Sequence, residues 1–212
     1  MVLFLSFLSP VSSMPQGAAS LRFRFAFGAL TGSGPNQRLT RISQDTTLRT
    51  GDKIRLMVEM QQAGFVYLIH RGPANSIDLL FPQDLKQTLQ VGRKYYVPDG
   101  TDWLEFDDTR GAESFYVLGS VQRLRSLESM LGRYQSATAA AKTGIAAEIV
   151  AEIRKLRAQN AATAEADRPV IIGGNVRGVD EIPVRGAPDV ASLAVDVSVN
   201  GFYGRTFTIE HR

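Results

Sequence analysis

The sequence predicts a mainly β protein, an immunoglobulin-like β-sandwich with an inserted or appended helical hairpin (α+β overall). Short apolar segments with a period of two residues recur along the first half of the chain, separated by Gly, Pro, Asn and Asp. Between about residues 122 and 160 the apolar period becomes three and four, which is typical of amphipathic helices. Strand-like segments then return, so we expect the hairpin to be inserted in one domain.

Composition permits a large folded domain and excludes several classes of site. The chain has 212 residues, of which 44% are hydrophobic. Its net charge is only +3, too small by itself to indicate a polyanionic partner, and we predict no nucleic-acid binding. There is no cysteine, which excludes disulfides, thiolate metal sites and a cysteine nucleophile.

The first twenty residues, MVLFLSFLSPVSSMPQGAAS, contain a short apolar run followed by small residues. This pattern is typical of the back part of a secretory signal peptide, although no Lys or Arg precedes the run. We therefore predict a signal peptide or leader at residues 1–19, and export to the periplasm or cell envelope. The run is too short to span a bilayer, and no other segment approaches that length.

A central β-hairpin is predicted over residues 64–82, with its turn at residues 72–76 and Pro82 ending the second strand. In its first strand Phe65, Tyr67 and Ile69 share one face and Val66, Leu68 and His70 the other, so both faces are expected to be covered. Core candidates are Phe65, Tyr67, Leu79 and Phe81. The other expected strands are 21–30, 38–43, 53–60, 94–97, 103–106, 114–118, 169–172, 193–199 and 206–209.

Two helices are expected at about residues 122–160, joined by the small and polar residues 136–143. The pair should pack on the sandwich or project from it. Apolar side chains at helical spacing are Leu124, Leu127, Leu131 and Tyr134, then Ile145, Ile149, Ile153 and Leu156. Seven basic residues lie on the helices, but glutamates interleave with them, which favours a solvated face with ion pairs.

Only His70 and His211 could serve as histidine acid–base groups. Ser76 and Asp78 lie near His70 across the predicted hairpin, but no Gly-x-Ser-x-Gly motif is present. We interpret His70 as a solvated or satisfied polar residue whose substitution should barely matter. His211 is next to the last residue, a poor place to hold a catalytic base. No catalytic residue is predicted.

An acidic cluster follows at Asp99, Asp102, Glu105, Asp107 and Asp108. Its spacing does not match a calcium-binding loop, so we interpret these residues as turns flanking a strand and predict no metal site, with cation binding left open. The glycine-rich spots, Gly32 to Gly34 and Gly173, Gly174 and Gly178, lack the strand–turn–helix context of a phosphate loop. No cofactor is predicted.

Several segments between about residues 48 and 120 form a distinctive series in their order and spacing. They are Gly51-Asp52 and the IRLMVE strand, Gly64 to Leu68, Leu80-Phe81-Pro82, Val91-Gly92, Val97-Pro98, Phe106-Asp107, Gly111-Ala112-Glu113 and Phe115. Together they resemble the bacterial domain of unknown function 4384. The resemblance implies a β-sandwich-like module of exported or envelope-associated bacterial proteins, with no established catalytic residues.

These observations favour a non-enzymatic, exported bacterial accessory module that binds another envelope protein, with the helical hairpin as the contact surface. We expect the β domain to fold without residues 122–160. One alternative is an envelope hydrolase that uses His70, Asp78 or the acids around Trp103. Another is carbohydrate binding, because the faces of Trp103, Tyr95 and Tyr96 could stack on sugars.

Overall fold

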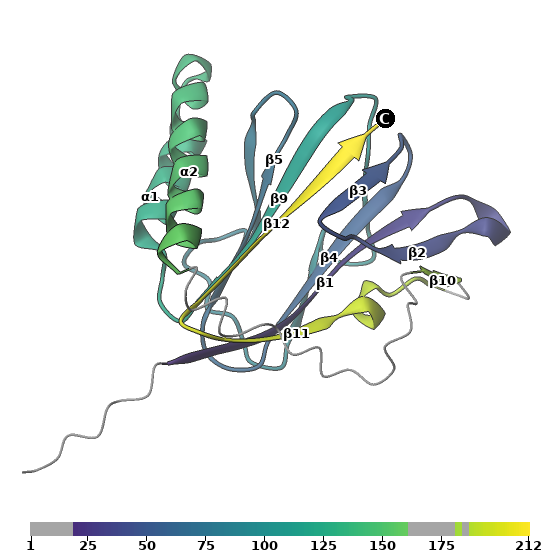
Figure 1. Ribbon diagram of the computed structural model, residues 1–212, viewed down its shortest axis with the longest axis horizontal. Helices are drawn as coiled ribbons and strands as arrows, with labels where there is room; N and C mark the ends of the chain where they lie inside the picture. The colour runs from purple at the N-terminus through teal and green to yellow at the C-terminus, as the bar shows by residue number, and fades with distance from the viewer. Residues whose placement is uncertain (1–18, 161–180, 184–186) are drawn as a thin grey trace, which may run out of the picture.

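Two β-sheets and a pair of helices form three layers in the computed structural model, which describes residues 19–160, 181–183 and 187–212 (Figure 1). The strands are β1 (Ser20–Thr31), β2 (Arg38–Arg41), β3 (Asp45–Leu48), β4 (Lys53–Met60), β5 (Phe65–Arg71), β6 (Ile77–Phe81), β7 (Lys94–Val97), β8 (Leu104–Glu105), β9 (Gly111–Ser120), β10 (Glu181–Pro183), β11 (Val195–Asn200) and β12 (Phe202–His211). The helices are α1 (Arg125–Ser136) and α2 (Ala139–Gln159), with short 3-10 helices at Gly34–Asn36 and Val190–Leu193. The predicted class, a β-sandwich with a helical hairpin, is confirmed.

The first sheet, which we call sheet A, has the order β10-β2-β1-β4-β7, with β11 also paired to β1 and β8 to β4. Strand β1 is long enough to pair with β11 along its first half and with β2 along its second. On its other side β1 pairs with β4, from Phe23 opposite Met60 to Leu30 opposite Lys53. Both strands, which were predicted from their alternating apolar residues, lie at the centre of sheet A because each pairs with strands on both sides.

The second sheet, sheet B, has the order β3-β12-β9-β5-β6. The last strand of the chain, β12, lies inside this sheet: it pairs antiparallel with β9, from Phe202 opposite Ser120 to His211 opposite Gly111, and parallel with β3. Strand β12 is longer than the 206–209 expected. It is central although it comes last in the sequence.

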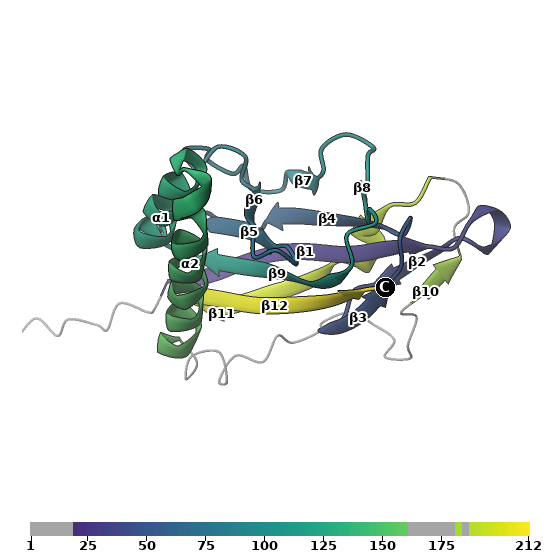
Figure 2. The same cartoon turned by 90° about the horizontal axis from the view of Figure 1, so that it is seen from above.

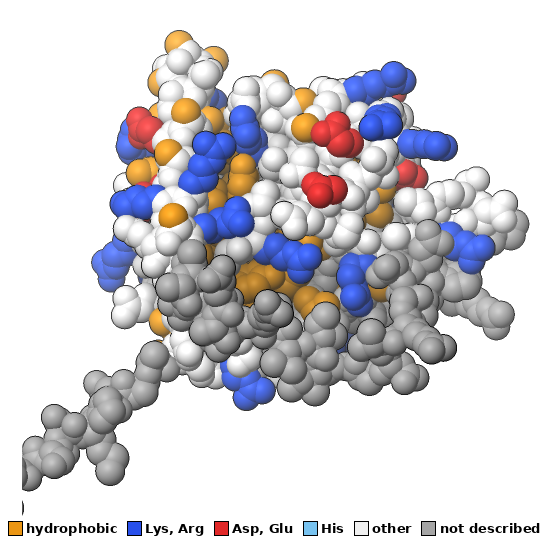
Figure 3. Space-filling view, in the orientation of Figure 1, with side chains coloured by type: hydrophobic (Ala, Val, Ile, Leu, Met, Phe, Trp, Pro, Cys, Tyr) orange, Lys and Arg blue, Asp and Glu red, His pale blue; other side chains and the backbone are white. Residues whose placement is uncertain are grey.

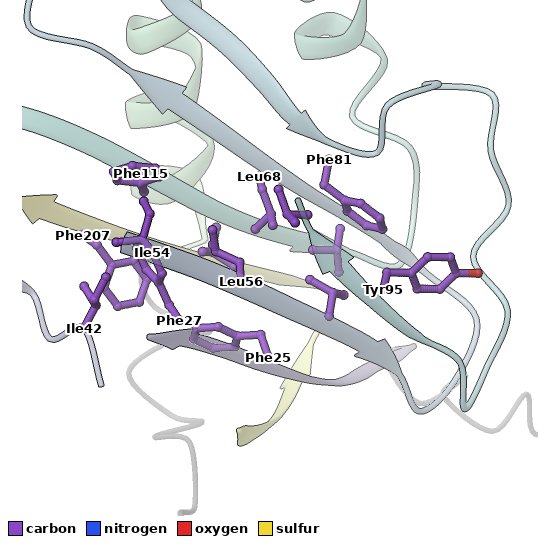
Figure 4. Packing of buried hydrophobic residues seen from close by; sticks show 14 of the residues in the cluster. Phe25, Phe27, Ile42, Ile54, Leu56, Leu68, Phe81, Tyr95, Phe115 and Phe207 are labelled. Atoms are coloured by element: carbon purple, nitrogen blue, oxygen red, sulfur yellow. The ribbon is translucent and has the colours of Figure 1, made fainter. Parts of the chain in front are cut away.

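The main core fills the space between the sheets, where aromatic rings from both inner faces meet (Figure 4). The ring of Phe27 in β1 lies 5.3 Å from that of Phe207 and 5.1 Å from that of Phe115, both in sheet B. Val66, Leu68 and Phe81 reach this core from the central hairpin, and all three are buried. The core between the sheets thus takes Val66 and Leu68 from β5, and not the core candidates Phe65 and Tyr67, which face the other side.

Helices α1 and α2 pack across one end of the outer face of sheet B (Figures 1 and 2). The apolar positions of the helices share a second buried cluster with Tyr67, Ile69, Tyr116 and Leu118 of the sheet. The core candidates Phe65 and Leu79 also pack against this cluster, but both are only partly buried. The covered outer face explains why β5 is apolar on both sides.

Several expected boundaries were wrong. The helices are joined by residues 137–138 alone, because the alanines from Ala139 onward favour helix and begin α2 directly after Thr138. Strand β8 has two residues instead of four, and residues 190–193 form a 3-10 helix before β11. Strand β3 was not expected. The predicted leader at 1–19 and the predicted strand at 169–172 lie outside the described residues, apart from residue 19.

Candidate functional site

A cavity of about 320 Å³ opens at the seam of the sandwich, where β6 at the edge of sheet B faces β8 of sheet A. Figure 2 shows β6, β7 and β8 along this side of the molecule. The cavity has an apolar part, formed by Ile54, Pro73, Leu80, Leu104, Phe106 and Phe115, and a polar part, formed by His70, Ser76, Asp78, Glu105, Asp107, Thr109 and Glu113.

The strand register brings the polar residues together. His70 in β5 is paired with Asp78 in β6 on one side and with Phe115 in β9 on the other. Ser76, Asp78 and Leu80 alternate along the chain and line the cavity. The residues between them, Ile77 and Leu79, face the helices. The hairpin turn predicted at 72–76 is confirmed, with Asn75 at a positive φ of 62°. It holds Ser76 at the mouth of the cavity.

His70 is held between two carboxylates. Its Nε2 atom lies 2.8 Å from Oε2 of Glu113, and its Nδ1 atom lies 3.5 Å from Oδ2 of Asp78. Its ring also lies against Phe115, with a centroid separation of 4.7 Å. Glu113 and His70 are largely shielded, with 12% and 19% of their side chains exposed, whereas Asp78 is 60% exposed.

These contacts determine the charge of the ring. Burial opposes protonation, but the hydrogen bonds to Asp78 and Glu113 outweigh it and raise the pKa of His70 to about 9. The hydrogen bond from His70 in turn lowers the pKa of Asp78. At neutral pH the ring is therefore an imidazolium: Nε2 donates to Glu113, Nδ1 faces Asp78 across 3.5 Å, and the ring has no lone pair with which to accept a proton.

The other polar residues of the cavity do not complete a nucleophile–base pair. No hydrogen bond joins Ser76 to His70 in the part of the chain that the structure describes. Asp107 accepts a hydrogen bond from the backbone N–H of Thr109 at 2.7 Å, which lowers the pKa of its exposed carboxyl. Glu105 pairs with Lys53 at 2.9 Å. The cavity thus concentrates negative charge beside an apolar wall.

His211 is firmly held, contrary to the expectation for a residue so near the end of the chain. It is only 3% exposed, because β12 runs inside sheet B. Its Nδ1 atom lies 2.9 Å from the carbonyl oxygen of Thr109 and its Nε2 atom 3.2 Å from Oγ1 of Thr50. These contacts tie β12 to the loop that borders the cavity.

Glu113 was missed as a partner of His70. Its place within the Gly-Ala-Glu segment of the family resemblance was the only signal in the sequence, because 43 residues separate it from His70 and only the β5–β9 pairing brings them together. The sequence alone could predict only that His70 lies on the face of its strand opposite to Tyr67 and Ile69.

The acidic cluster and the glycine-rich spots are the remaining sequence candidates, and part of them lies among the described residues. Within the described ranges, no group of three or more His, Asp or Glu side chains is placed to hold a metal ion. Gly32 and Gly34 have positive φ values of 75° and 53° at the turn after β1, and Gly173, Gly174 and Gly178 lie outside the described residues. The interpretation of Gly32 and Gly34 as turn residues is confirmed.

The helices carry the ion pairs expected from their interleaved charges. Arg133 pairs with Glu148 at 3.1 Å, joining α1 to α2, and Lys155 pairs with Glu152 at 3.3 Å. On the face seen in Figure 3, basic side chains are separated by uncharged surface rather than gathered in one patch.

The aromatic side chains considered for sugar stacking are engaged with neighbouring protein groups. Tyr95 is buried in the main core, and its hydroxyl accepts a hydrogen bond from the backbone N–H of Gln90 at 2.8 Å. The guanidinium of Arg55 lies over the ring of Tyr96, 4.5 Å from its centroid, and 5.9 Å from that of Trp103. One face of Tyr96 is thus covered by a cation.

No described helix is both long enough and apolar enough to cross a membrane. Neither the curated proteins nor the solved structures contain a match to this chain. A family match does exist, and it includes every residue that lines the cavity but neither helix nor β12. Residues 47–123 match the family described as Domain of unknown function (DUF4384), as the resemblance over about residues 48–120 predicted.

Proposed function

We propose that this protein is a non-enzymatic accessory module, exported by bacteria, that binds another protein of the cell envelope. The observation that supports binding rather than catalysis is the state of His70. Its Nε2 atom donates to Glu113, its Nδ1 atom forms a longer ion pair with Asp78, and its raised pKa keeps it protonated at neutral pH. A general base needs a free lone pair near its operating pH, and this histidine offers none.

Export is supported by the apolar run and small residues at the start of the sequence and by the family resemblance. If a leader is removed, the mature protein should begin near residue 20, at the start of β1. Fractionation of the source bacterium, followed by mass spectrometry of the protein's N-terminus, tests this. A cytoplasmic protein with residues 1–19 intact would contradict export.

Two surfaces compete as the contact site. The hairpin uses its large apolar side chains against sheet B, so its outer face presents mainly alanine and charged residues, such as Ala147, Ala151 and Arg154. The seam at β6 instead presents a cavity with apolar and acidic walls beside a strand edge that no other described strand pairs with. Interface anchors are usually apolar or aromatic groups that fill pockets, which favours the seam over the hairpin.

Photo-crosslinking in living cells tests both the binding function and the surface. A photoreactive amino acid is placed at Ser76 beside the cavity in one variant, and at Ala147 on the hairpin in another; both positions are exposed. We expect Ser76 to crosslink one reproducible envelope protein, which must then bind the purified chain. No such protein at either position would contradict the proposal, and capture only at Ala147 would favour the hairpin.

A second candidate, an envelope hydrolase, is favoured by one observation: the cavity gathers Ser76, Asp78, Asp107 and Glu113 around His70. This hypothesis requires turnover of an ester, peptide or glycan by the purified protein. It also requires that His70→Ala or Asp107→Asn remove the activity while the fold is retained. A negative result across a broad hydrolase panel would exclude it and leave the binding function in place.

A further inference from the structure

Strand β6 has a free outer edge. It is the last strand of sheet B, and among the described residues it pairs only with β5. Gly72 donates its N–H to the carbonyl of Ser76, and His70 is paired with Asp78, so the alternation of an antiparallel pair turns the backbone groups of Ile77 and Leu79 away from β5.

Part of this edge is already used. The N–H of Ile77 donates to the hydroxyl of Tyr134 in α1 at 3.0 Å. Outside the β5–β6 pair, neither the carbonyl of Ile77 nor the N–H or carbonyl of Leu79 makes a backbone hydrogen bond within the described part of the chain. The register with β5 shifts directly after Leu79, between Ile69 and Leu68, so the regular pairing ends at this residue. Free N–H and carbonyl groups at a strand edge can pair with a strand from another chain. Because Tyr134 already occupies the Ile77 end of this edge, only a short segment could be added.

The cavity lies directly beside these groups. Ser76, Asp78 and Leu80 alternate along the strand and all three line the cavity. A segment hydrogen-bonded to Leu79 would extend sheet B over the seam, with every second side chain on the cavity side. The main-chain bonds would supply affinity, and the cavity would select one side chain.

The charge of the cavity specifies that side chain. Its lining carries the carboxylates of Asp78, Glu105, Asp107 and Glu113 against the single imidazolium of His70. Lys53 pairs with Glu105, and Lys142 lies near enough to Asp78 to contribute to its lowered pKa, yet the sum remains negative. The apolar wall suits the methylene stem of a long side chain, and the carboxylates suit a cationic head.

We propose that the edge of β6 and this cavity form a docking site for an extended segment of a partner protein that places a Lys or Arg side chain in the cavity. The proposal rests on the binding function proposed above and specifies its site and the chemistry of its partner. The cavity volume of about 320 Å³ accommodates one such side chain rather than a folded element.

The test is a selection of phage-displayed random heptapeptides on the immobilised full chain. We expect enriched peptides to carry Lys or Arg with apolar or β-branched residues at alternating positions. A synthetic peptide from this set should bind at least tenfold more weakly when its basic residue is replaced by citrulline or norleucine. Methylation of one backbone amide should weaken it similarly at alternating positions, because only every second amide faces β6.

Matched protein variants locate the site. Ser76→Arg places a cation at the mouth of the cavity and should lower affinity at least tenfold, whereas Ser198→Arg, on the exposed face of β11 in sheet A, should not change it. Thermal melting checks that both variants are folded, and an ¹⁵N spectrum of the unchanged protein should show the largest shift changes at Leu79 on titration with the peptide.

The results separate this proposal from the binding function. Enrichment of peptides without basic residues, failure to enrich any peptide, or affinity unaffected by Ser76→Arg would each overturn the docking site. The binding function is judged independently by crosslinking in cells, so a partner captured there through another surface would uphold it while this site fails.

Discussion

Nε2 of His70 lies 2.8 Å from Oε2 of Glu113, and this ion pair fastens β5 to β9 at the cavity end of sheet B. On its other side His70 reaches Asp78, so one imidazolium joins three neighbouring strands. Only 12% of the Glu113 side chain is exposed, so removal of His70 would leave a poorly solvated carboxylate without its cation. The expectation that substitution of His70 should barely matter is therefore replaced by the opposite prediction.

His70→Ala is predicted to lower the free energy of unfolding by about 2 kcal/mol, because it leaves Glu113 without its cation. Urea denaturation followed by circular dichroism measures the change. Asp78→Asn is the matched control and should cost less than about 1 kcal/mol, since Asp78 is mostly exposed and its contact is longer. If His70→Ala costs no more than Asp78→Asn, the pair with Glu113 is not stabilising.

Stability is predicted to fall as the pH rises above neutrality. The pKa of His70 is about 9 in the folded protein against 6.5 for an ordinary histidine, so the folded state binds this proton more tightly. The contribution is complete below pH 6.5 and is lost as pH rises to about 9, with a total on the order of 3 kcal/mol. Urea midpoints at intervals from pH 6 to 9.5 measure it.

His70→Gln supplies the control for the pH series, because glutamine keeps hydrogen-bonding groups and does not titrate. Its unfolding free energy should vary much less over this range. Equal slopes for the two proteins would show that another group causes the pH dependence. The lowered pKa of Asp78 acts at the other end: its contribution is present above pH 3.8 and is lost in more acidic solution.

Tyr67 joins sheet B to the start of α1. Its hydroxyl donates to Oε1 of Glu128 at 2.5 Å and accepts the N–H of Leu124 at 3.2 Å. Burial, together with the bond to Glu128, raises the pKa of Tyr67. We predict that Tyr67→Phe lowers the free energy of unfolding by about 1–2 kcal/mol, because it leaves both groups with one partner fewer.

Tyr116→Phe is the matched control for this prediction. Tyr116 lies in the same cluster, and its hydroxyl has no hydrogen-bond partner among the described residues, so its removal should change stability by less than about 0.5 kcal/mol. Urea denaturation compares the two variants. A similar effect of both would mean that packing of the rings, and not the hydroxyl network, determines the cost.

Local patterns predicted most of the elements of this fold. The period of two located β1, β4, β5, β6, β7 and β9, and the helical period located α1 and α2, because each pattern reflects one buried face. The end of β9 was set too early: the strand continues through Gly119, where a Cβ would lie 2.8 Å from Leu21 and 2.9 Å from Phe23 of sheet A. Glycine at this position lets the two sheets pack closely, and the residues around Gly119 in the sequence give no sign of this requirement.

Long-range pairing was not predictable in the same way. Strand β3 has little apolar pattern and pairs in parallel with β12, more than 160 residues later. The burial of His211 follows from that pairing and from its contacts to Thr50 and Thr109. Likewise, the sequence suggested His70, Ser76 and Asp78 as neighbours within one hairpin, but Glu113 and Asp107 reach the cavity only through the assembly of both sheets.

The last prediction concerns the helical hairpin, which shares a buried cluster with sheet B. Deletion of residues 122–160 would uncover Tyr67, Ile69, Tyr116 and Leu118, each at most 7% exposed in the intact protein. The β domain was expected to fold without the hairpin; the structure instead predicts aggregation or strong binding of a hydrophobic dye, because a broad apolar face meets water.

Point variants test the same relationship without deletion. Leu127→Ala removes a fully buried side chain of α1 and should lower the free energy of unfolding by about 2–4 kcal/mol, whereas Ala147→Ser on the exposed side of α2 should change it by less than about 0.5 kcal/mol. Both values come from urea denaturation of the full chain. A soluble, monomeric deletion variant with an unchanged near-ultraviolet spectrum, together with a negligible effect of Leu127→Ala, would show that the hairpin is an independent unit. It would then be free to serve as the contact surface that the sequence favoured.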